Sequence, residues 1–129
     1  MTGRLALVAL VVEDYDAAID WFRRALRFAL IEDSPRENGG RWVVMRPPGG
    51  GADLLLARAG TPAQAETVGR AAGGRVAFFL YTDDFAAEHA RMSAEGVVFE
   101  APPRDEAYGR VAVFRDLCGN RWDLIGRRA

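Results

Sequence analysis

The chain repeats its own secondary-structure pattern. Residues 11–18 (VVEDYDAA) return as residues 81–88 (YTDDFAAE), and each copy contains an apolar strand, an acidic turn and an amphipathic helix. Asp14 and Asp84 lie 70 residues apart, at equivalent places in the two copies. A repeat of this length predicts one supersecondary unit that is used twice, with a binding surface where the copies meet.

The first copy predicts one helix and four strands. Residues 5–12 form a strand that is apolar on both faces, and Asp14 is a suitable N-cap for a helix over residues 15–26. The apolar side chains of that helix recur on one face. Further strands are expected at residues 28–32, 42–45 and 54–57, with loops at residues 34–40 and 47–51.

The second copy predicts the same order. Residues 58–74 are rich in Ala, Gly and Gln and favour a linker, with a short helix around residues 63–71. A strand at residues 75–81 then precedes a helix over residues 84–95, which Gly96 closes as a left-handed C-cap. The remaining elements are strands at residues 97–100, 111–114 and 121–125, a loop at 102–108 and a turn at 116–120.

The order strand, helix and three strands, read twice, predicts an α+β fold of two tandem βαβββ modules. Neither four-stranded curved sheet can bury both of its faces alone. We therefore expect a half-open eight-stranded curved sheet, with helices on the convex face and a trough on the concave face. Residues 1–129 are expected to form a single domain, with module 1 at about 1–58, a linker at about 59–74 and module 2 at about 75–126.

The composition argues against several classes of function. A net charge of -1 gives no basic footprint for nucleic acid. No apolar run approaches the roughly 18 residues that a membrane span needs. The apolar run near the N-terminus is not followed by the small-residue cleavage site of a signal peptide. We expect a cytoplasmic protein with neither nucleic-acid nor membrane partners.

Cys118 is the only cysteine and His89 the only histidine. An intrachain disulfide and a cysteine metal cluster are therefore impossible. Sequence distance does not exclude a Cys–His nucleophile pair. However, Phe85, His89 and Met92 recur on one stripe of the predicted helix, and no orienting partner for the imidazole is evident. We favour a half-buried, non-catalytic histidine.

Four segments resemble the vicinal oxygen chelate superfamily, which includes glyoxalase I, extradiol dioxygenases, fosfomycin-resistance enzymes and bleomycin-resistance proteins. Residues 12–22 and 26–28 are similar to its first helix and exit turn, with Arg27 where the family usually has glycine. Residues 108–110 are similar to the segment before its seventh strand, and residues 116–124 to its closing turn and last strand. The likeness runs in order along nearly the whole chain and implies the same fold.

The family's metal enzymes hold one divalent ion with side chains from the first and last strand of each module. The resemblance places Leu7 and Ala77 at the two histidine positions, seven residues before each helix-capping Asp. The first acidic position falls within residues 54–56, which are all leucine, and use of Asp53 would need a register slip. The final glutamate becomes Asp123. Because one carboxylate cannot hold a divalent cation against water, we expect no metal and no cofactor.

Strand alternation predicts which other side chains share the face of the ligand positions. Trp42 is expected to reach the trough, and Tyr108 lies on a loop that could close over it. Such a surface is aromatic and aliphatic with a few charges, which matches a small-ligand pocket. The candidate ligand-binding residues are Leu7, Trp42, Arg75, Ala77, Phe79, Tyr81, Tyr108, Arg121 and Asp123.

Asp123 is also the candidate catalytic residue. We favour a non-catalytic ion pair between Asp123 and Arg75 or Arg121. If Asp123 is instead shielded from water and has no ion-pair partner, its pKa should rise, which would make it a candidate acid or base.

Three functions remain open. The leading hypothesis is a metal-independent protein, closest to the bleomycin-resistance branch, that binds an aromatic or amphipathic small molecule; the resemblance also implies a homodimer. The alternative is an enzyme: a metal-free lyase or isomerase that uses Asp123, or a metal-dependent lyase or dioxygenase with displaced ligands. The third is a non-binding interaction module whose trough is filled by side chains.

Overall fold

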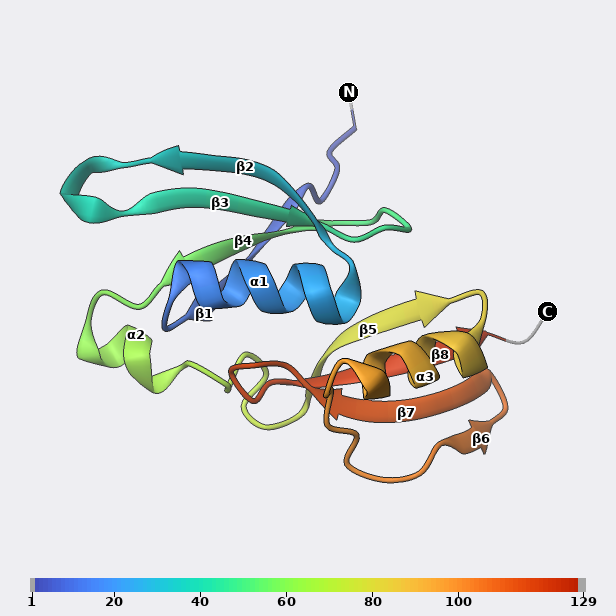
Figure 1. The fold of residues 1–129 in the computed structure, drawn as a ribbon. Helices are drawn as coiled ribbons and strands as arrows, with labels where there is room; N and C mark the ends of the chain where they lie inside the picture. Colours follow the sequence, from blue (N-terminus) through green and yellow to red (C-terminus); the bar gives the residue numbers. More distant parts are fainter. Residues whose placement is uncertain (1, 128–129) are drawn as a thin grey trace. The chain divides into compact units, whose positions relative to one another are not determined.

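The computed structural model describes residues 2–127, which fall into two compact units (Figure 1). The units are residues 1–68, called module 1 from here on, and residues 69–129, called module 2. The boundary between them lies inside the segment that was expected to link the modules. No helix among the described residues has the length and apolar character needed to cross a membrane.

The two modules have the same strand order. Module 1 contains β1 (Leu7–Val12), α1 (Tyr15–Leu26), β2 (Ala29–Pro35), the 3-10 turn η1 (Glu37–Gly39), β3 (Arg41–Arg46), β4 (Asp53–Arg58) and α2 (Pro62–Glu66). Module 2 contains β5 (Val76–Thr82), α3 (Phe85–Ala94), β6 (Arg104–Glu106), β7 (Gly109–Arg115) and β8 (Arg121–Arg127). The sheets have the orders β1-β4-β3-β2 and β5-β8-β7-β6, so the predicted α+β fold of tandem βαβββ modules is confirmed.

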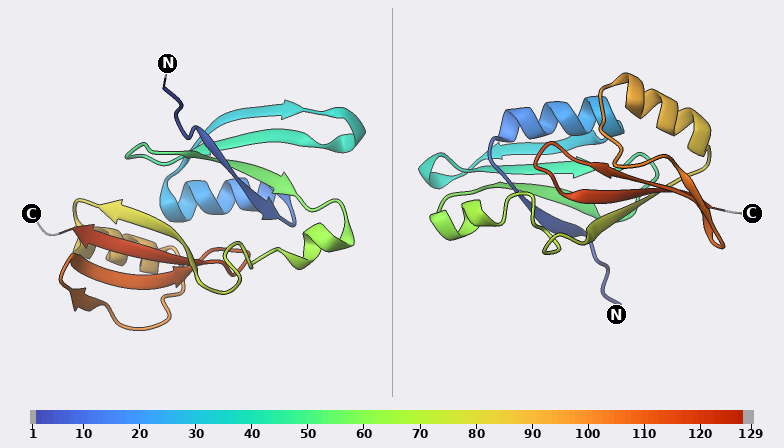
Figure 2. Two further views of the ribbon diagram at one scale, coloured as in Figure 1. Left: turned by 180° about the vertical axis from the view of Figure 1, so that it is seen from behind. Right: turned by 90° about the horizontal axis from the view of Figure 1, so that it is seen from below.

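Helix α1 packs tightly on one face of its sheet, against β3 and β4 (Figures 1 and 2). Asp14 caps it as predicted, because its Oδ2 accepts a 2.7 Å hydrogen bond from the Ala17 amide. Arg27 ends it in the left-handed conformation, with φ 58°, at the place where the resemblance expects glycine. The buried helix residues are Tyr15, Ala18, Ile19, Phe22, Ala25 and Leu26.

Helix α3 covers the equivalent face of the module 2 sheet but buries much less of itself. Asp84 caps it through a hydrogen bond from the Ala87 amide, and Gly96 follows it with φ 88°. Met92 is its only buried residue. The helix approaches β8 closely at its first turn, where a Cβ added to Gly126 would lie 2.6 Å from the Cβ of Phe85.

A buried carboxylate fixes the turn between β7 and β8. Asp116 is 5% exposed and accepts hydrogen bonds from the Cys118 amide, from the amide and side chain of Asn120, and from Trp122 Nε1. Asn120 Oδ1 in turn accepts from the Ala71 amide. Asp116 is therefore satisfied by four donors, as buried polar groups usually are.

Two predicted elements of module 2 are wrong. Residues 97–100 form no strand, only an isolated bridge between Phe99 and Phe114, and the third strand of the module is β6, inside the segment predicted as a loop. Pro102 and Pro103 lack amide hydrogens, so a regular ladder with β7 begins only at Arg104.

Two boundaries in module 1 also differ. Strand β2 continues to Pro35, into the predicted loop, because it pairs with β3 along its length. The helix expected around residues 63–71 is shorter, from Pro62 to Glu66, with Thr61 as its N-cap. Gly69, with φ 78°, follows it and leaves no room for a side chain, since a Cβ would lie 2.3 Å from the carbonyl oxygen of Cys118.

Candidate functional site

The module 2 sheet has one face that α3 does not cover, called the open face below. Trp122 and Leu124 are buried and lie on the same strand face as Gly126, which meets Phe85 of α3, so they belong to the helix-covered face; the ring centroids of Trp122 and Phe78 lie 4.5 Å apart. Strand alternation then turns Asp123 to the open face. In the ladder, Phe79 and Val113 flank Asp123 on its two sides. The predicted grouping of Phe79, Tyr81 and Asp123 on one face is therefore observed.

Aromatic side chains of the open face are unusually exposed for their size. Phe79 is 60% exposed and Tyr81 59% exposed, and the guanidinium of Arg127 lies 5.0 Å above the Tyr81 ring. Tyr108, in the turn between β6 and β7, is 54% exposed. Exposed aromatic side chains that lie side by side, as Phe79 and Tyr81 do on β5, are typical of a site for a ligand or partner.

Asp123 lies buried among these exposed groups. It is 6% exposed, and its Oδ1 is shielded from solvent with no hydrogen-bond partner among the described residues. Burial raises the pKa of this carboxyl, because removal from water disfavours the charged form; the positive charges of Arg104 and Arg121 oppose the shift. A buried acceptor without a donor is costly, so it favours a ligand that supplies one.

The expected ion pair of Asp123 with Arg75 or Arg121 is wrong. Arg121 Nε donates a 2.8 Å hydrogen bond to Glu100, which also receives a bond from Arg115 Nη2. The Arg121 hydrogen bond, reinforced by the charges of both arginines, lowers the pKa of Glu100. The ion-pair partner of Arg121 is therefore Glu100 and not Asp123.

Arg104 is a candidate site residue that sequence reasoning missed. It lies on β6 opposite Val111, a residue of the open face, and its charge acts on Asp123. Its Nε donates to Glu106 at 2.8 Å. The segment was predicted as a loop, because three strand residues are too few to show the alternation that identifies a strand.

The other predicted residues of module 2 lie at the start of β5. Arg75 is exposed and directly precedes the strand, and its amide donates to the Ala72 carbonyl. Ala77 lies at an irregularity in the β5–β8 ladder. Their assignment to a ligand site stays a prediction.

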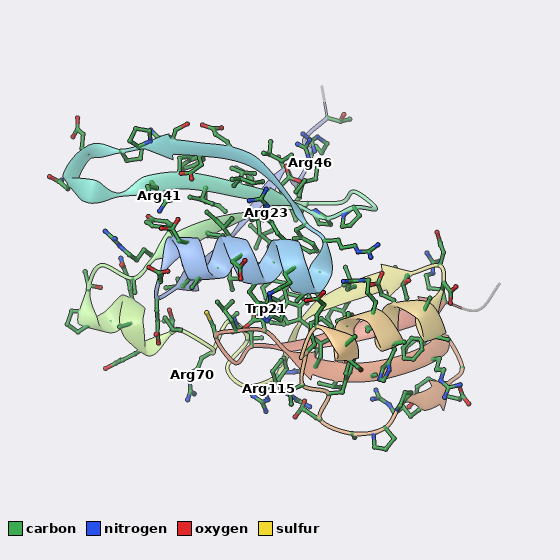
Figure 3. All side chains as sticks on the ribbon, viewed as in Figure 1. Trp21, Arg23, Arg41, Arg46, Arg70 and Arg115 are labelled. Atoms are coloured by element: carbon green, nitrogen blue, oxygen red, sulfur yellow. The ribbon has the colours of Figure 1, made fainter. Side chains whose placement is uncertain are left out.

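In module 1, Leu7 lies on β1 opposite Asp53, on the sheet face away from α1. Asp53 therefore shares the face of Leu7 without the register slip that the sequence argument assumed. Arg46, labelled in Figure 3, binds both oxygens of Asp53 at 3.1 and 2.9 Å. Trp42 lies two residues before Val44 and four before Arg46, on the same face of β3, and the guanidinium of Arg36 lies 4.7 Å from the centre of its ring.

The donor groups do not fit the divalent ion of the family's enzymes. Leu7 and Ala77 end in carbon, as does Leu55, the counterpart of Asp123 in the repeat. Asp53 is already neutralised by Arg46. Within residues 2–127, no three His, Cys, Asp or Glu side chains are grouped so that they could hold a metal ion.

His89 is stacked between Phe85 and Phe99, with ring centroids at 5.6 and 4.1 Å. Its Nε2 is buried and has no hydrogen-bond partner among the described residues, so this nitrogen does not bond Cys118. Cys118 instead belongs to the Asp116 turn. The structure thus supplies no Cys–His nucleophile pair, and the predicted half-buried position of His89 is confirmed.

Known proteins share both the sequence pattern and the fold. The chain is 53% identical over 127 residues to an uncharacterized protein of Shewanella frigidimarina (strain NCIMB 400), covering 97% of this chain and 94% of that one. It is similar to the crystal structure of UcmS2, with 27% identity, TM-score 0.83 and coverage of 97% and 98%. TnmS3, an antibiotic binding protein from Streptomyces sp. CB03234, has 27% identity, TM-score 0.77 and 98% coverage of both chains.

The family model that matches the chain extends over residues 4–124, which include both modules. This protein therefore belongs to the Glyoxalase/Bleomycin resistance protein/Dioxygenase superfamily.

Proposed function

We propose that the protein binds an aromatic or amphipathic small molecule on the open face of module 2, without a metal ion. The observation that carries this proposal is the pair of exposed rings, Phe79 and Tyr81, beside a buried carboxylate whose Oδ1 lacks a donor. The rings offer stacking and apolar contact, and Asp123 offers an acceptor for a cation or hydrogen-bond donor on the ligand.

Two further observations support this function. The family's metal positions are occupied here by Leu7, Leu55 and Ala77, which cannot ligate an ion. TnmS3, which is similar over nearly the whole chain, is described as an antibiotic binding protein. A flat antibiotic with a basic group is therefore a suitable ligand class for the first experiment.

The test is a thermal-shift screen of bleomycin and flat aromatic cations against protein treated with a chelator and checked for metal content. A ligand that binds only the folded state raises the unfolding temperature. Phe79→Ala should weaken the affinity of a binding compound about tenfold through lost stacking. Val98→Ala, which truncates another exposed apolar residue of module 2, is the matched control and should leave the affinity unchanged.

Stoichiometric zinc, nickel, manganese or iron in the purified protein, required for binding, would contradict the metal-independent function. Equal loss of affinity in the Phe79 and Val98 variants would show that the open face is not the site.

A second function is favoured by the raised pKa of Asp123. A carboxyl with such a pKa can hold a proton nearer neutral pH and act as an acid or base in a metal-free lyase or isomerase. Asp123→Asn should then abolish turnover while ligand binding survives, and the pH–rate profile should lose one limb. Turnover that is unchanged in this variant would exclude that chemistry.

We also propose that the protein is a homodimer, the assembly implied by the resemblance. Light scattering after size-exclusion chromatography measures the mass directly. The expected mass is twice that of the 14.1 kDa chain, and a mass of one chain at working concentration would overturn the assignment.

A further inference from the structure

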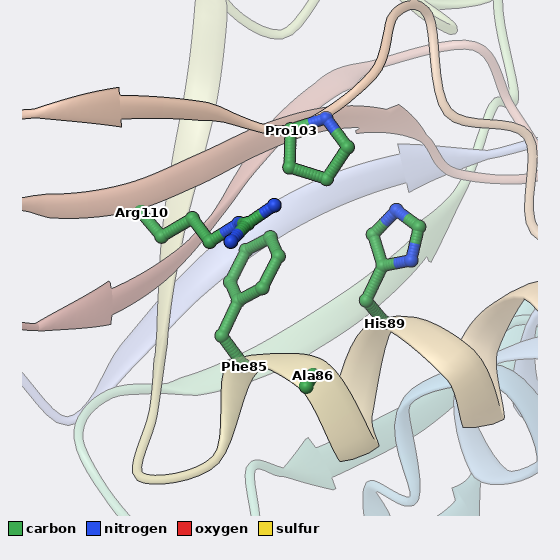
Figure 4. A pocket seen from close by; sticks show the side chains of 5 residues that line it. All are labelled: Phe85, Ala86, His89, Pro103 and Arg110. Carbon is green, nitrogen blue, oxygen red and sulfur yellow. The ribbon is translucent and has the colours of Figure 1, made fainter.

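Module 2 contains a pocket on the face of its sheet that α3 covers, opposite to the open face (Figure 4). Its volume is about 480 Å³, within the roughly 300–1,000 Å³ that small-molecule sites occupy. The residues that line it are Phe85, Ala86, His89, Pro103 and Arg110. None of them belongs to the proposed ligand site.

The helix residues of the pocket have counterparts in module 1, because α1 and α3 begin at equivalent capping residues, Asp14 and Asp84. The same spacing relates Tyr15 to Phe85, Asp16 to Ala86 and Ile19 to His89.

The sheet residues of the pocket have counterparts too. Val43 pairs with Leu56 on β4, and Ala112 pairs with Leu124 on β8, so Val43 and Ala112 are equivalent positions. Arg41 and Arg110 each lie two residues before these positions and are therefore equivalent as well. The partner of Val43 on β2 is Asp33. Continuing the β6–β7 ladder by one residue past the Arg104–Val111 pair brings Pro103 opposite Ala112, and Pro103 lines the pocket together with Arg110.

In module 1 this set of residues forms a closed ion cluster. Arg41 Nη2 donates to Asp16 at 2.9 Å and to Asp33 at 2.7 Å, and its guanidinium lies 5.0 Å above the ring of Tyr15. Figure 3 shows Arg41 on β3 beside α1. The cluster raises the pKa of Arg41 and lowers that of Asp33. Two carboxylates of the chain itself thus neutralise the arginine.

In module 2 both carboxylates are missing, because Ala86 and Pro103 stand in their places. Arg110 forms no ion pair with any residue of the described range 2–127; its guanidinium lies 5.8 Å above the Phe85 ring (Figure 4). Asp105 faces Arg110 across the ladder but is not bonded to it. The adjacent wall also holds the unpartnered Nε2 of His89.

We propose that this pocket binds a small aryl or alkyl carboxylate, whose carboxylate takes the place beside Arg110 that Asp16 and Asp33 occupy beside Arg41. A guanidinium binds a carboxylate through two parallel hydrogen bonds, which gives direction as well as charge attraction. Phe85 and Pro103 provide the apolar contact for the body of the ligand. Arg41 therefore stabilises module 1, whereas its counterpart Arg110 is available to bind a ligand.

The experiment is a titration with benzoate, phenylacetate and hexanoate, followed by two-dimensional ¹H–¹⁵N NMR of the whole chain, with benzyl alcohol as the uncharged control. Benzoate should shift the amide signals of Phe85, His89 and Arg110 at millimolar concentration, and benzyl alcohol should not. Arg110→Gln, a change at an exposed residue, should weaken binding about tenfold.

The sharpest variant restores the module 1 arrangement. Ala86→Asp puts back the counterpart of Asp16 and should weaken benzoate binding about as much as removal of the guanidinium, because the arginine gains an internal partner. Ala87→Asp adds the same charge on the same helix turn outside the pocket, and should bind benzoate as the parent does. Aspartate is favourable in the first turn of a helix, so both variants should fold.

Three results would overturn the proposal. They are no shift with any of the three carboxylates, equal weakening by the Ala86 and Ala87 substitutions, or shifts confined to the open face around Phe79 and Asp123. None of them contradicts the proposed function, which uses other residues.

Discussion

The two modules share one topology but differ in how completely they use their polar groups. In module 1, Arg41 is neutralised by two aspartates, Asp53 by Arg46, and six residues of α1 are buried. In module 2, Arg110 has no ion-pair partner and the Oδ1 of Asp123 has no hydrogen-bond partner in the described part of the chain, and α3 buries one residue. This difference is the reason why we propose ligand binding in module 2 and a structural role for module 1.

The helix packing should give the largest difference between the modules. Phe22→Ala removes a fully buried ring from α1 and should lower the free energy of unfolding by about 3–5 kcal/mol. Phe85→Ala, at the first turn of α3, should cost clearly less because its ring is partly exposed. Urea unfolding of both variants measures this, and equal losses would show that the modules are packed alike.

The second difference lies at Leu55 and Asp123. Asp123→Leu copies the module 1 residue and should raise the free energy of unfolding at neutral pH by about 1–3 kcal/mol, because it removes a buried, unpartnered carboxylate. Since the folded state raises the pKa of Asp123, the wild type loses stability as pH rises above the ordinary carboxyl range. The advantage of the variant should therefore shrink on acidification. A variant that is less stable at neutral pH would contradict the assignment.

The helix exits provide a smaller test. Arg27 adopts φ 58° and Gly96 φ 88°, a region that disfavours side chains. Arg27→Gly should raise the free energy of unfolding, and Gly96→Ala should lower it, by about 1 kcal/mol each. Thermal unfolding of the two variants checks the opposite signs; a shift of the same sign in both would exclude the left-handed conformation at one of the exits.

The smallest effect is expected at Asp33, which is exposed. Its pKa is lowered by the hydrogen bond from Arg41, so its contribution to stability is present near neutral pH and is lost as pH falls through the lowered pKa. Asp33→Asn should be slightly less stable than the wild type at neutral pH and equal to it in acid. This pH dependence is opposite in sign to that of Asp123, and stability curves against pH for the two variants should diverge accordingly.

The repeat and the helix caps made most of the fold predictable. Asp14, Asp84 and Gly96 mark helix ends by local chemistry alone, and strand alternation grouped Phe79 with Asp123. The surroundings of Asp123 could not be predicted, because its lack of a partner depends on where Glu100 lies. That residue belongs to the segment whose strand was misplaced, since the sequence carries no local signal for a bridge between Phe99 and Phe114.

Part of the difference between the modules at the Arg110 pocket could have been predicted from the sequence. The spacing that aligns Asp14 with Asp84 also aligns Asp16 with Ala86, which shows the loss of a charge at one of two equivalent places. What the spacing alone could not show is that Asp16 and Asp33 bind one arginine, because that contact joins a helix to two strands.

The central claim is that module 2 binds an aromatic small molecule on its open face without a metal. The most direct measurement is NMR chemical-shift mapping of chelator-treated protein, titrated with the compound that gives the largest thermal shift. The account predicts perturbed signals at Phe79, Tyr81 and Asp123 with the chelator present. Binding that appears only after a divalent metal is added, or perturbations confined to residues outside the open face, would contradict it.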